Sequence, residues 1–276
     1  MSNTPTMPVQ FPAKAMIAMV GLRPLPGSPG YDGSEHAIVD RALQDIELYT
    51  AAGADAVLLE NSGDLPYSKP PLQKETVVAV SHIAKLIRRR VKKPIGLQLL
   101  EAANDQALHI AAETGLDFIR AEGYVFAHVG GAGIIEGCAG KLLRLRKQLR
   151  VESIRIFADV RKKHCSHALT GDLDLAEHVR QADFFKADGI IVTGPRTGAE
   201  PSTDDLLESR SATGLPILIG SGMTPENLHR HFPHADGFIV GSALRKEGRF
   251  LGDLCPDRLQ AFMDEFRRLK SAAGAG

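Results

Sequence analysis

A short phrase recurs four times along this chain, and each copy runs directly into a series of apolar residues. The copies are Gly-Ala-Asp-Ala-Val-Leu-Leu-Glu at 53–60, Gly-Leu-Asp-Phe-Ile-Arg-Ala-Glu at 115–122, Lys-Ala-Asp-Gly-Ile-Ile-Val-Thr at 186–193 and His-Ala-Asp-Gly-Phe-Ile-Val-Gly at 234–241. Four further apolar runs alternate with these copies, at 15–20, 95–100, 154–160 and 217–219. Most of these segments are followed by a stretch with helical periodicity. Eight alternating strand and helix units predict an α/β fold, the (β/α)8 TIM barrel.

The length of the chain fits one such barrel. It has 276 residues, and eight strand and helix units need roughly 250. We therefore expect a single barrel domain over residues 15–270, with an N-terminal extension at 1–14 and a disordered tail at 271–276. Barrels of this kind carry their chemistry in the loops after the strands, so functional residues are expected there.

Composition favours a small-molecule partner. The chain has 33 Lys plus Arg and 33 Asp plus Glu, so no net field draws it to nucleic acid. Its apolar runs are shorter than the ~20 residues of a membrane span, and residues 1–13 lack the blocks of a secretory signal. Three cysteines without metal-site spacing suit a reducing compartment. We expect a cytoplasmic protein without membrane insertion and, by analogy with other barrels, a homo-oligomer.

Three carboxylates stand at strand ends. Glu60, Glu122 and Asp159 end the second, fourth and fifth expected strands, so they should converge on one mouth. Converging carboxylates can bind a divalent cation, or they can perform acid/base catalysis once repulsion separates their pKa values. They can equally be structural, in ion pairs with a neighbouring strand, and Arg120 is an available partner. Gln98, after the third strand, faces the same mouth.

The segment after the fifth strand concentrates charge. If the strand continues, Asp159, Arg161 and Lys163 share one face. Lys163 could then hold a substrate phosphate or enolate or, if desolvated, act as a base or as a Schiff-base nucleophile. His164 could transfer protons near neutral pH. The basic residues Arg161, Lys162 and His167 are interpreted as a solvated turn. Cys165 is interpreted as an inert thiol.

The loop after the fourth strand, at 123–137, is long and carries five glycines. Such a loop suits a mobile cover over the barrel mouth. His128 within it is interpreted as a surface residue.

Two glycine-containing turns follow the seventh and eighth strands. The first reads Gly-Ser-Gly-Met-Thr-Pro at 220–225, with Thr224 as a helix N-cap and Pro225 at the first helical position. In barrels these two loops commonly bind a phosphate through backbone N–H groups. The alternative is that the glycines only turn tight corners. The predicted phosphate-binding residues are Gly220, Ser221, Gly222, Gly241 and Ser242.

Seven motifs, spread over nearly the whole chain, form a specific combination. They are Arg-Pro-Leu-Pro-Gly-Ser-Pro (23–29), Glu-Asn-Ser-Gly-Asp-Leu-Pro-Tyr (60–67), Gly-Ile-Ile-Glu-Gly (133–137), Asp-Val-Arg-Lys-Lys-His (159–164), Val-Thr-Gly-Pro-Arg-Thr-Gly (192–198), Gly-Ser-Gly-Met-Thr-Pro-Glu-Asn (220–227) and Gly-Phe-Ile-Val-Gly-Ser (237–242). Together they resemble the BtpA/SgcQ family. The resemblance implies a TIM barrel of the phosphate-binding type. The family's founding member is linked to photosystem I biogenesis, and bacterial relatives are associated with sugar metabolism.

By position, the resemblance implies further site residues and also marks departures. Besides the two glycine turns it implies Pro26, Gly27, Ser28, Glu60, Asn61, Asp64, Glu136, Asp159, Lys163, His164, Thr193 and Thr197. The departures are Gly21 in place of a His-containing start to the first loop, Gln98-Leu-Leu-Glu101 in place of Asn-x-x-Arg, and Glu122-Gly-Tyr in place of an Asn-containing segment. Glu101 reverses a charge near the mouth, which predicts a less anionic ligand or a different activity.

The function hypothesis is an enzyme for a phosphorylated sugar or nucleotide-derived metabolite, with isomerase, lyase or hydrolase chemistry. Its catalytic candidates are Glu60, Glu122, Asp159, Lys163 and His164. Its substrate-binding candidates are Asn61, Asp64, Gln98, Arg120, Glu136, Thr193 and Thr197. The pattern demands no cofactor, although the carboxylates would suit a divalent cation. The alternative is a non-catalytic assembly or regulatory factor that keeps a ligand-binding barrel. On the enzyme hypothesis, Asp159→Asn and Lys163→Ala abolish turnover with little change in melting temperature.

Overall fold

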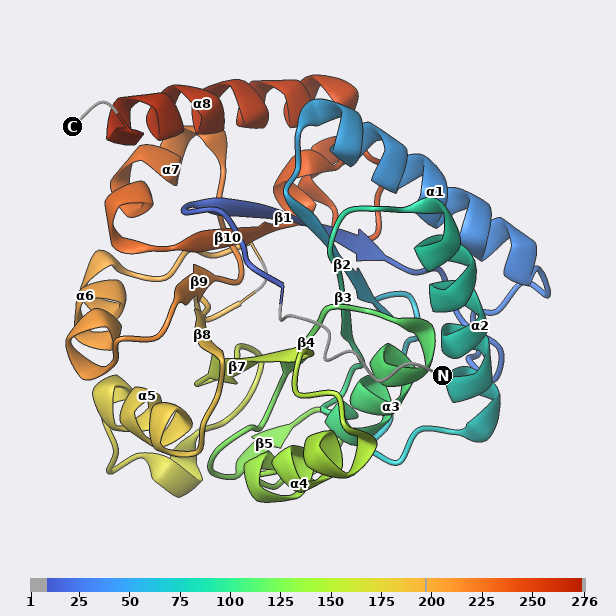
Figure 1. The fold of residues 1–276 in the computed structure, drawn as a ribbon, viewed down its shortest axis with the longest axis horizontal. Helices are drawn as coiled ribbons and strands as arrows, with labels where there is room; N and C mark the ends of the chain where they lie inside the picture. Colours follow the sequence, from blue (N-terminus) through green and yellow to red (C-terminus); the bar gives the residue numbers. More distant parts are fainter. Residues whose placement is uncertain (1–8, 197, 275–276) are drawn as a thin grey trace.

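The computed structural model, which describes residues 9–196 and 198–274, contains a closed barrel of parallel strands. Figure 1 shows the helices as an outer ring around these strands. The order around the barrel is β1-β10-β9-β8-β7-β4-β3-β2. The strands are β1 (Ala15–Gly21), β2 (Ala56–Glu60), β3 (Ile95–Gln98), β4 (Phe118–Ala121), β7 (Arg155–Val160), β8 (Gly189–Val192), β9 (Ile217–Ile219) and β10 (Gly237–Val240). The predicted TIM barrel and its eight strands are confirmed.

The helices lie between consecutive barrel strands. They are α1 (Glu35–Ala52), α2 (Lys74–Arg90), α3 (Asn104–Thr114), α4 (Ala139–Leu149), α5 (Leu175–Phe184), α6 (Thr203–Ala212), α7 (Pro225–His231) and α8 (Pro256–Gly274). Helix α1 ends at Gly53, as expected, where φ is 98° and glycine is favoured. Helix α8 continues into the segment expected to be a disordered tail, while residues 275–276 lie outside the described residues. Among the described helices, none has the length and apolarity needed to cross a bilayer.

The aspartate in each copy of the repeated phrase clamps two neighbouring strands together. Its carboxylate accepts a hydrogen bond of 2.8 Å from an amide near the start of the preceding barrel strand. Its own amide donates to the carbonyl of that same residue. The four pairs are Asp55 with Met16, Asp117 with Ile95, Asp188 with Ile156 and Asp236 with Ile217.

Each of these aspartates also has a basic partner from a helix: for three of them it is the helix that precedes the clamped strand, and for Asp55 it is the C-terminal helix α8. The partners are Lys270 of α8 for Asp55, Arg88 of α2 for Asp117, Arg146 of α4 for Asp188 and Arg210 of α6 for Asp236. The repeat therefore joins the pairs β1–β2, β3–β4, β7–β8 and β9–β10 at the amino-terminal end of the barrel.

The lower part of the barrel interior is filled by an apolar cluster. Its members are Ile17, Met19, Ala56, Leu58, Phe118, Phe157, Ile191, Leu218 and Ile239. The two phenylalanine rings fit because glycine stands at the registered position of a neighbouring strand. A Cβ on Gly96 would lie 2.1 Å from the Phe118 ring, and one on Gly189 would lie 2.6 Å from Phe157. Phe11 packs against both rings, with centroid distances of 5.4 and 5.8 Å, and closes this end.

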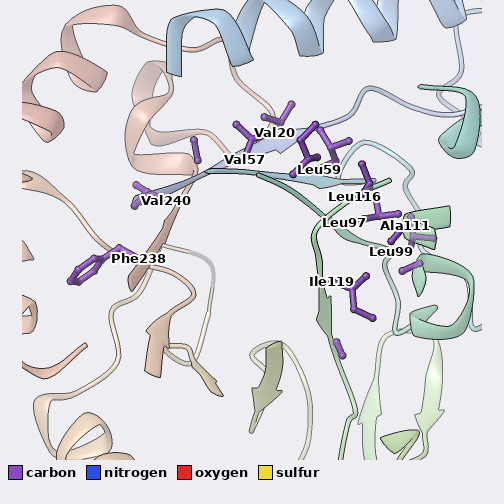
Figure 2. Close-up of a cluster of buried hydrophobic side chains, with 14 of the residues drawn as sticks. Val20, Val57, Leu59, Leu97, Leu99, Ala111, Leu116, Ile119, Phe238 and Val240 are labelled. Atoms are coloured by element: carbon purple, nitrogen blue, oxygen red, sulfur yellow. The ribbon is translucent and has the colours of Figure 1, made fainter. Parts of the chain in front are cut away.

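Side chains on the outer face of the strands pack against the helices. Figure 2 shows Val57 and Leu59 of β2 near Leu97 of β3. The same cluster includes Ala111 of α3 and Leu116, which follows that helix. Each strand thus has one face toward the interior and the other toward the helix layer, as barrel strands require.

The loop after β4 contains regular structure that the sequence analysis did not predict. Strands β5 (His128–Gly130) and β6 (Gly133–Ile135) form an antiparallel hairpin. Val129 exchanges two backbone hydrogen bonds with Ser166, of 3.0 and 2.8 Å, which tie the hairpin to the loop after β7. His128 is 4% exposed, so its interpretation as a surface residue is wrong. Three of the five glycines, Gly130, Gly131 and Gly133, lie at the turn of this hairpin.

We expect Asp188→Ala to lower the free energy of unfolding by about 1.5–3 kcal/mol. The substitution removes a charged acceptor that takes one hydrogen bond from the Ile156 amide and one from the Arg146 side chain. Urea unfolding followed by circular dichroism measures this change. Asp172→Ala, at an exposed position of the loop before α5, is the control and should change stability by less than about 0.5 kcal/mol. Equal effects of the two substitutions would contradict the clamp.

Candidate functional site

The carboxyl ends of the barrel strands enclose a cavity of about 750 Å³. This volume is within the range of about 300–1,000 Å³ that is typical of small-molecule sites. Polar side chains from the strand ends and the loops after them line it: Glu60, Gln98, Glu101, Arg120, Glu122, Lys162, Lys163 and His164. The turns at 220–224 and 241–243 and Arg258 of α8 line it as well. The predicted mouth of the barrel is therefore hollow, and charged side chains lie within a lining that is mostly apolar.

Strand alternation decides which side chains reach this cavity. On β2 the inward positions are Ala56, Leu58 and then Glu60, and on β4 the inward series begins with Phe118 and Arg120. Because every second residue faces the interior, one row changes from apolar at the base to charged at the mouth. The same parity places Gln98 and Glu122 on the cavity wall. Glu60, Gln98, Arg120 and Glu122 therefore lie at the mouth of the barrel.

A buried ion pair joins β4 to β7. The Nε and Nη2 of Arg120 donate to the two carboxylate oxygens of Asp159, at 2.8 and 3.0 Å. Both side chains are at most 5% exposed. Burial disfavours the charged guanidinium, but the adjacent Asp159 keeps the pKa of Arg120 above its usual value. Arg120 lines the cavity, and Asp159 lies behind it as the structural partner that the alternative interpretation described.

A second network corrects the interpretation of Lys162 as part of a solvated turn. Its Nζ lies 2.6 Å from Glu101 Oε1 and 3.1 Å from Glu122 Oε2, and its side chain is 10% exposed. Glu101 also accepts a hydrogen bond from the Ala132 amide of the hairpin, at 3.0 Å. Burial alone would lower the pKa of Lys162 by disfavouring its ammonium form. The negative charges of Glu122 and Glu101 outweigh this effect and raise the pKa. The charge reversal at Glu101 is thus balanced by a lysine.

Glu122 is surrounded by polar contacts and fully enclosed. Its oxygens accept hydrogen bonds from Gln98 Nε2 at 2.9 Å and from the Ala102 amide at 3.1 Å. Burial raises the pKa of its carboxyl from the ordinary 4.5 to about 7, and the nearby charge of Lys162 only partly opposes this. A carboxyl group with such a pKa can both accept and donate a proton at neutral pH.

Lys163 lines the cavity beside these groups but is not locked by them. Burial and the neighbouring Arg120 lower its pKa, against the opposing charges of Glu60, Asp159 and Glu122. Within the described part of the chain, the structure gives its Nζ no ion pair within 4.0 Å. The two adjacent lysines therefore have different electrostatic states.

The chain turns sharply just before these lysines, so the expected continuation of the strand is wrong. Strand β7 ends at Val160, and Arg161 has a φ of 47°. Arg161 is exposed and does not share a face with Lys163 toward the cavity. His164 lines the cavity mouth, and burial together with Lys163 and Lys162 lowers its pKa. Burial raises the pKa of the Cys165 thiol to about 11, which agrees with an inert thiol.

Both glycine turns reach the cavity, together with an arginine that sequence analysis missed. No described acceptor takes a hydrogen bond from the amides of Gly222, Ser242 or Ala243. Arg258, in the first turn of α8, lies beside the second of these turns, and its Nη1 is 3.4 Å from the Ala243 carbonyl. A Cβ on Gly222, where φ is 81°, would lie 2.3 Å from the Ala199 backbone, so this turn also packs closely against the loop after β8.

Several predicted substrate-binding residues support loops rather than line the cavity. Asn61 bridges two loops, since its Oδ1 accepts from the Leu100 amide at 2.6 Å and its Nδ2 donates to the Leu100 carbonyl at 3.0 Å. Asp64 is half-buried, and burial raises its pKa. Glu136 directly follows the hairpin in sequence and is exposed. Thr193 has a buried Oγ1 without a described partner. Thr197 lies outside the described residues.

The residues implied in the first loop also have a structural role. Thr76 Oγ1 of α2 donates to the Pro26 carbonyl at 3.2 Å. Gly27 has a φ of 94°, which favours glycine at this turn. Ser28 closes the turn through its amide, which donates to Leu25 at 3.0 Å.

Carboxylates converge on the mouth as expected, but cations separate them. Lys162 Nζ lies between Glu101 and Glu122, and Arg120 neutralises Asp159. In the described residues, no group of three or more His, Cys, Asp or Glu side chains is arranged to hold a metal ion. Glu60 differs from the other acids, since its Oε1 accepts from Ser62 at 2.7 Å and it has no ion pair with a described residue.

The raised pKa of Glu122 predicts how stability depends on pH. Between about pH 4.5 and 7 the folded protein retains a proton that the unfolded chain releases, so the free energy of unfolding falls as pH rises through this window. Glu122→Gln, which imitates the protonated form, should weaken this dependence. Urea unfolding between about pH 5 and pH 8 measures it. The exposed Glu75→Gln is the control, and a Glu122→Gln profile parallel to wild type would contradict the assignment.

The buried ion pair between Arg120 and Asp159 changes our expectation for Asp159→Asn, which was a nearly unchanged melting temperature. This substitution leaves a buried guanidinium without its partner and should cost about 3–5 kcal/mol of stability. Asp264→Asn, which removes an exposed pair with Arg267, should cost less than about 1 kcal/mol. Thermal and urea unfolding of both variants compare the two; a stable Asp159→Asn variant would show that Arg120 finds another acceptor.

Comparison with solved structures places the fold among known barrels. Phosphoribosyl anthranilate isomerase from Thermus thermophilus superimposes with a TM-score of 0.58 at 14% identity, covering 92% of this chain and 99% of that one. Thiamine phosphate pyrophosphorylase from Pyrococcus furiosus gives a TM-score of 0.56 at 11% identity, covering 93% and 96%. At these identities the likeness concerns the fold alone.

Sequence comparison identifies relatives over almost the full length. An uncharacterised mitochondrial protein of Caenorhabditis elegans is 40% identical, covering 92% of this chain and 94% of the relative. Photosystem I biogenesis protein BtpA of Synechocystis is 34% identical, covering 90% and 86%. The family model described as BtpA family matches residues 12–268. The chain therefore belongs to the BtpA family.

Proposed function

We propose that this protein is an enzyme that acts on a phosphorylated metabolite, a sugar phosphate or a nucleotide-derived compound, by acid/base catalysis. One observation carries the proposal. A single cavity brings together a buried carboxyl with a pKa of about 7 and two turns in which the amides of Gly222, Ser242 and Ala243 have no described acceptor. An anion could occupy the turns while the proton-transferring group faces the rest of the ligand.

The phosphate would bind at the turns after β9 and β10. The amides of Gly222, Ser242 and Ala243 supply donors, and Arg258 adds a positive charge beside them. Two structurally similar proteins are named for phosphorylated compounds, phosphoribosyl anthranilate and thiamine phosphate. Their likeness in fold supports this location without identifying the ligand.

Proton transfer would involve Glu122 and Glu60. Glu122 exchanges a proton near neutral pH because of its burial, and Glu60 lines the same cavity without a cationic partner among the described residues. Arg120, held by Asp159, provides a fixed positive charge that acts on both carboxyl groups. This arrangement suits the stabilisation of a negative charge that develops on substrate oxygen. Isomerase, lyase and hydrolase reactions all use such a step.

One relative supports the alternative of a non-catalytic role. Photosystem I biogenesis protein BtpA is named for an assembly process, and a barrel that binds a ligand without turnover would share the cavity. The ionisable groups of the cavity favour the enzyme, because binding alone has no need for a buried carboxyl that titrates near neutrality.

We expect inorganic phosphate, ribose 5-phosphate or adenosine monophosphate to raise the melting temperature saturably. Arg258→Ala should weaken this binding about tenfold or more, because a hydrogen bond to a charged group contributes about 1.5–3 kcal/mol. Ser242→Asp should abolish it by repulsion. Thermal-shift titration, with and without a divalent cation, measures each case.

The matched control is Arg268→Ala, an exposed arginine of the same helix that pairs with Glu265. It should bind phosphate as wild type does. If neither phosphate nor any phosphorylated compound shifts the melting temperature, the turns are only structural corners, and the assembly role becomes the better account.

A further inference from the structure

We propose that Lys163 is a nucleophile whose Nζ condenses with the carbonyl group of a phosphorylated ketone or aldehyde to form a protonated imine. The inference rests on the proposed function, because the phosphate end of the ligand would position its carbonyl in the cavity. It narrows the ligand from phosphorylated metabolites in general to those with a reactive carbonyl.

The contrast between two adjacent lysines carries the argument. Lys162 is fixed by carboxylates at 2.6 and 3.1 Å, so it remains an ammonium and its nitrogen has no free electron pair to attack with. Lys163 lines the same cavity and, within the described residues, has no carboxylate within 4.0 Å. The turn at Arg161, with its φ of 47°, redirects the chain before both lysines, and beyond it the two side chains have different neighbours.

The surroundings of Lys163 favour its neutral amine. Arg120 is a permanent cation, held within the barrel by two hydrogen bonds to Asp159. Burial is the main cause that lowers the pKa of Lys163, and the Arg120 charge adds to it, while the carboxylates of Glu60, Asp159 and Glu122 partly oppose the shift. A lysine that is desolvated next to another cation is the standard arrangement for an amine nucleophile.

The condensation balances without an external reagent. The ammonium form of Lys163 and a carbonyl give a protonated imine and one water, and the net charge of +1 is conserved. In the first step the neutral nitrogen forms a bond to the carbonyl carbon while the oxygen takes a proton. In the second step that oxygen takes another proton and leaves as water, and the nitrogen electron pair forms the double bond.

The cavity contains groups for these proton transfers. Glu122 can give a proton to the departing oxygen and recover one from the nitrogen, since it titrates near neutrality. Once the imine has formed, its positive charge withdraws electrons from the adjacent carbon. The Glu60 carboxylate, which lacks a cationic partner among the described residues, can then take a proton from that carbon to leave an enamine.

Pyridoxal 5′-phosphate, a phosphorylated aldehyde that forms imines with amines, is a suitable probe. The purified full-length chain is incubated with the probe, reduced with borohydride and digested, and each lysine peptide is quantified by mass spectrometry. We expect Lys163 to be labelled markedly faster than the exposed Lys92, because burial and the neighbouring Arg120 lower its pKa and so leave more of it as the free amine that attacks the aldehyde. Lys162 should remain almost unlabelled.

Inorganic phosphate should slow labelling of Lys163 and not of Lys92. Lys163→Arg keeps the charge and should lose the label at this position, while Lys92→Arg should label Lys163 normally. Because the wild-type peptide map gives the answer by itself, a variant that fails to fold does not affect the test.

The outcomes separate this inference from the proposed function. Selective labelling of Lys163 supports the nucleophile, and protection by phosphate adds support for the phosphate site. If phosphate raises the melting temperature but Lys163 is labelled no faster than Lys92, the nucleophile is wrong and the proposed function stands. If Lys163 is labelled selectively but phosphate neither protects it nor shifts the melting temperature, the carbonyl site stands and the phosphate site is wrong.

Discussion

The clamp made by the four repeated aspartates is the interaction on which the mouth of this barrel depends. Each carboxylate fixes the start of one strand against the next, at the end of the barrel opposite the cavity. A parallel strand that slipped by one residue would turn every inward side chain outward. Glu60 and Arg120 would then face the helix layer, where charged groups have no partners. Stability at one end thus determines the chemistry available at the other.

Closure of the barrel imposes a second constraint, because below the cavity its interior is filled by side chains. Phe118 and Phe157 fill the base only because Gly96 and Gly189 stand opposite them in register. Above this apolar layer, any inward position must carry a group that is either paired or exposed to the cavity. The pairing of Arg120 with Asp159 follows from that requirement.

Period-two alternation explains how much of the fold and site could be predicted. The strands, their order along the chain and the mouth residues Glu60, Gln98, Arg120 and Glu122 all follow from a local pattern that the barrel respects. The repeat also marked the clamping aspartates, although its phrase alone did not say that the carboxylates bind strand amides.

The errors arose where the chain leaves that pattern. At Arg161 the positive φ ends the alternation, so parity could not say which of the next two lysines is paired. Lys162 depends on Glu101 and Glu122, which are about 60 and 40 positions away in sequence, respectively, so no local pattern reveals these contacts. The hairpin at 128–135 and Arg258 of α8 were missed for the same reason, since tertiary contacts place them at the mouth.

The balance of charge around the cavity indicates which groups respond to a ligand. Lys162 is committed to two carboxylates and Arg120 to one, so their charges are compensated before any ligand arrives. Lys163, Glu60 and Arg258 have no such commitment among the described residues. An anionic ligand at the glycine turns would bring a negative charge toward Arg258, whereas a carbonyl near Lys163 would convert a disfavoured ammonium into an imine. The three groups without an ion pair to a described residue, rather than the paired charges, therefore determine which ligand this cavity can bind.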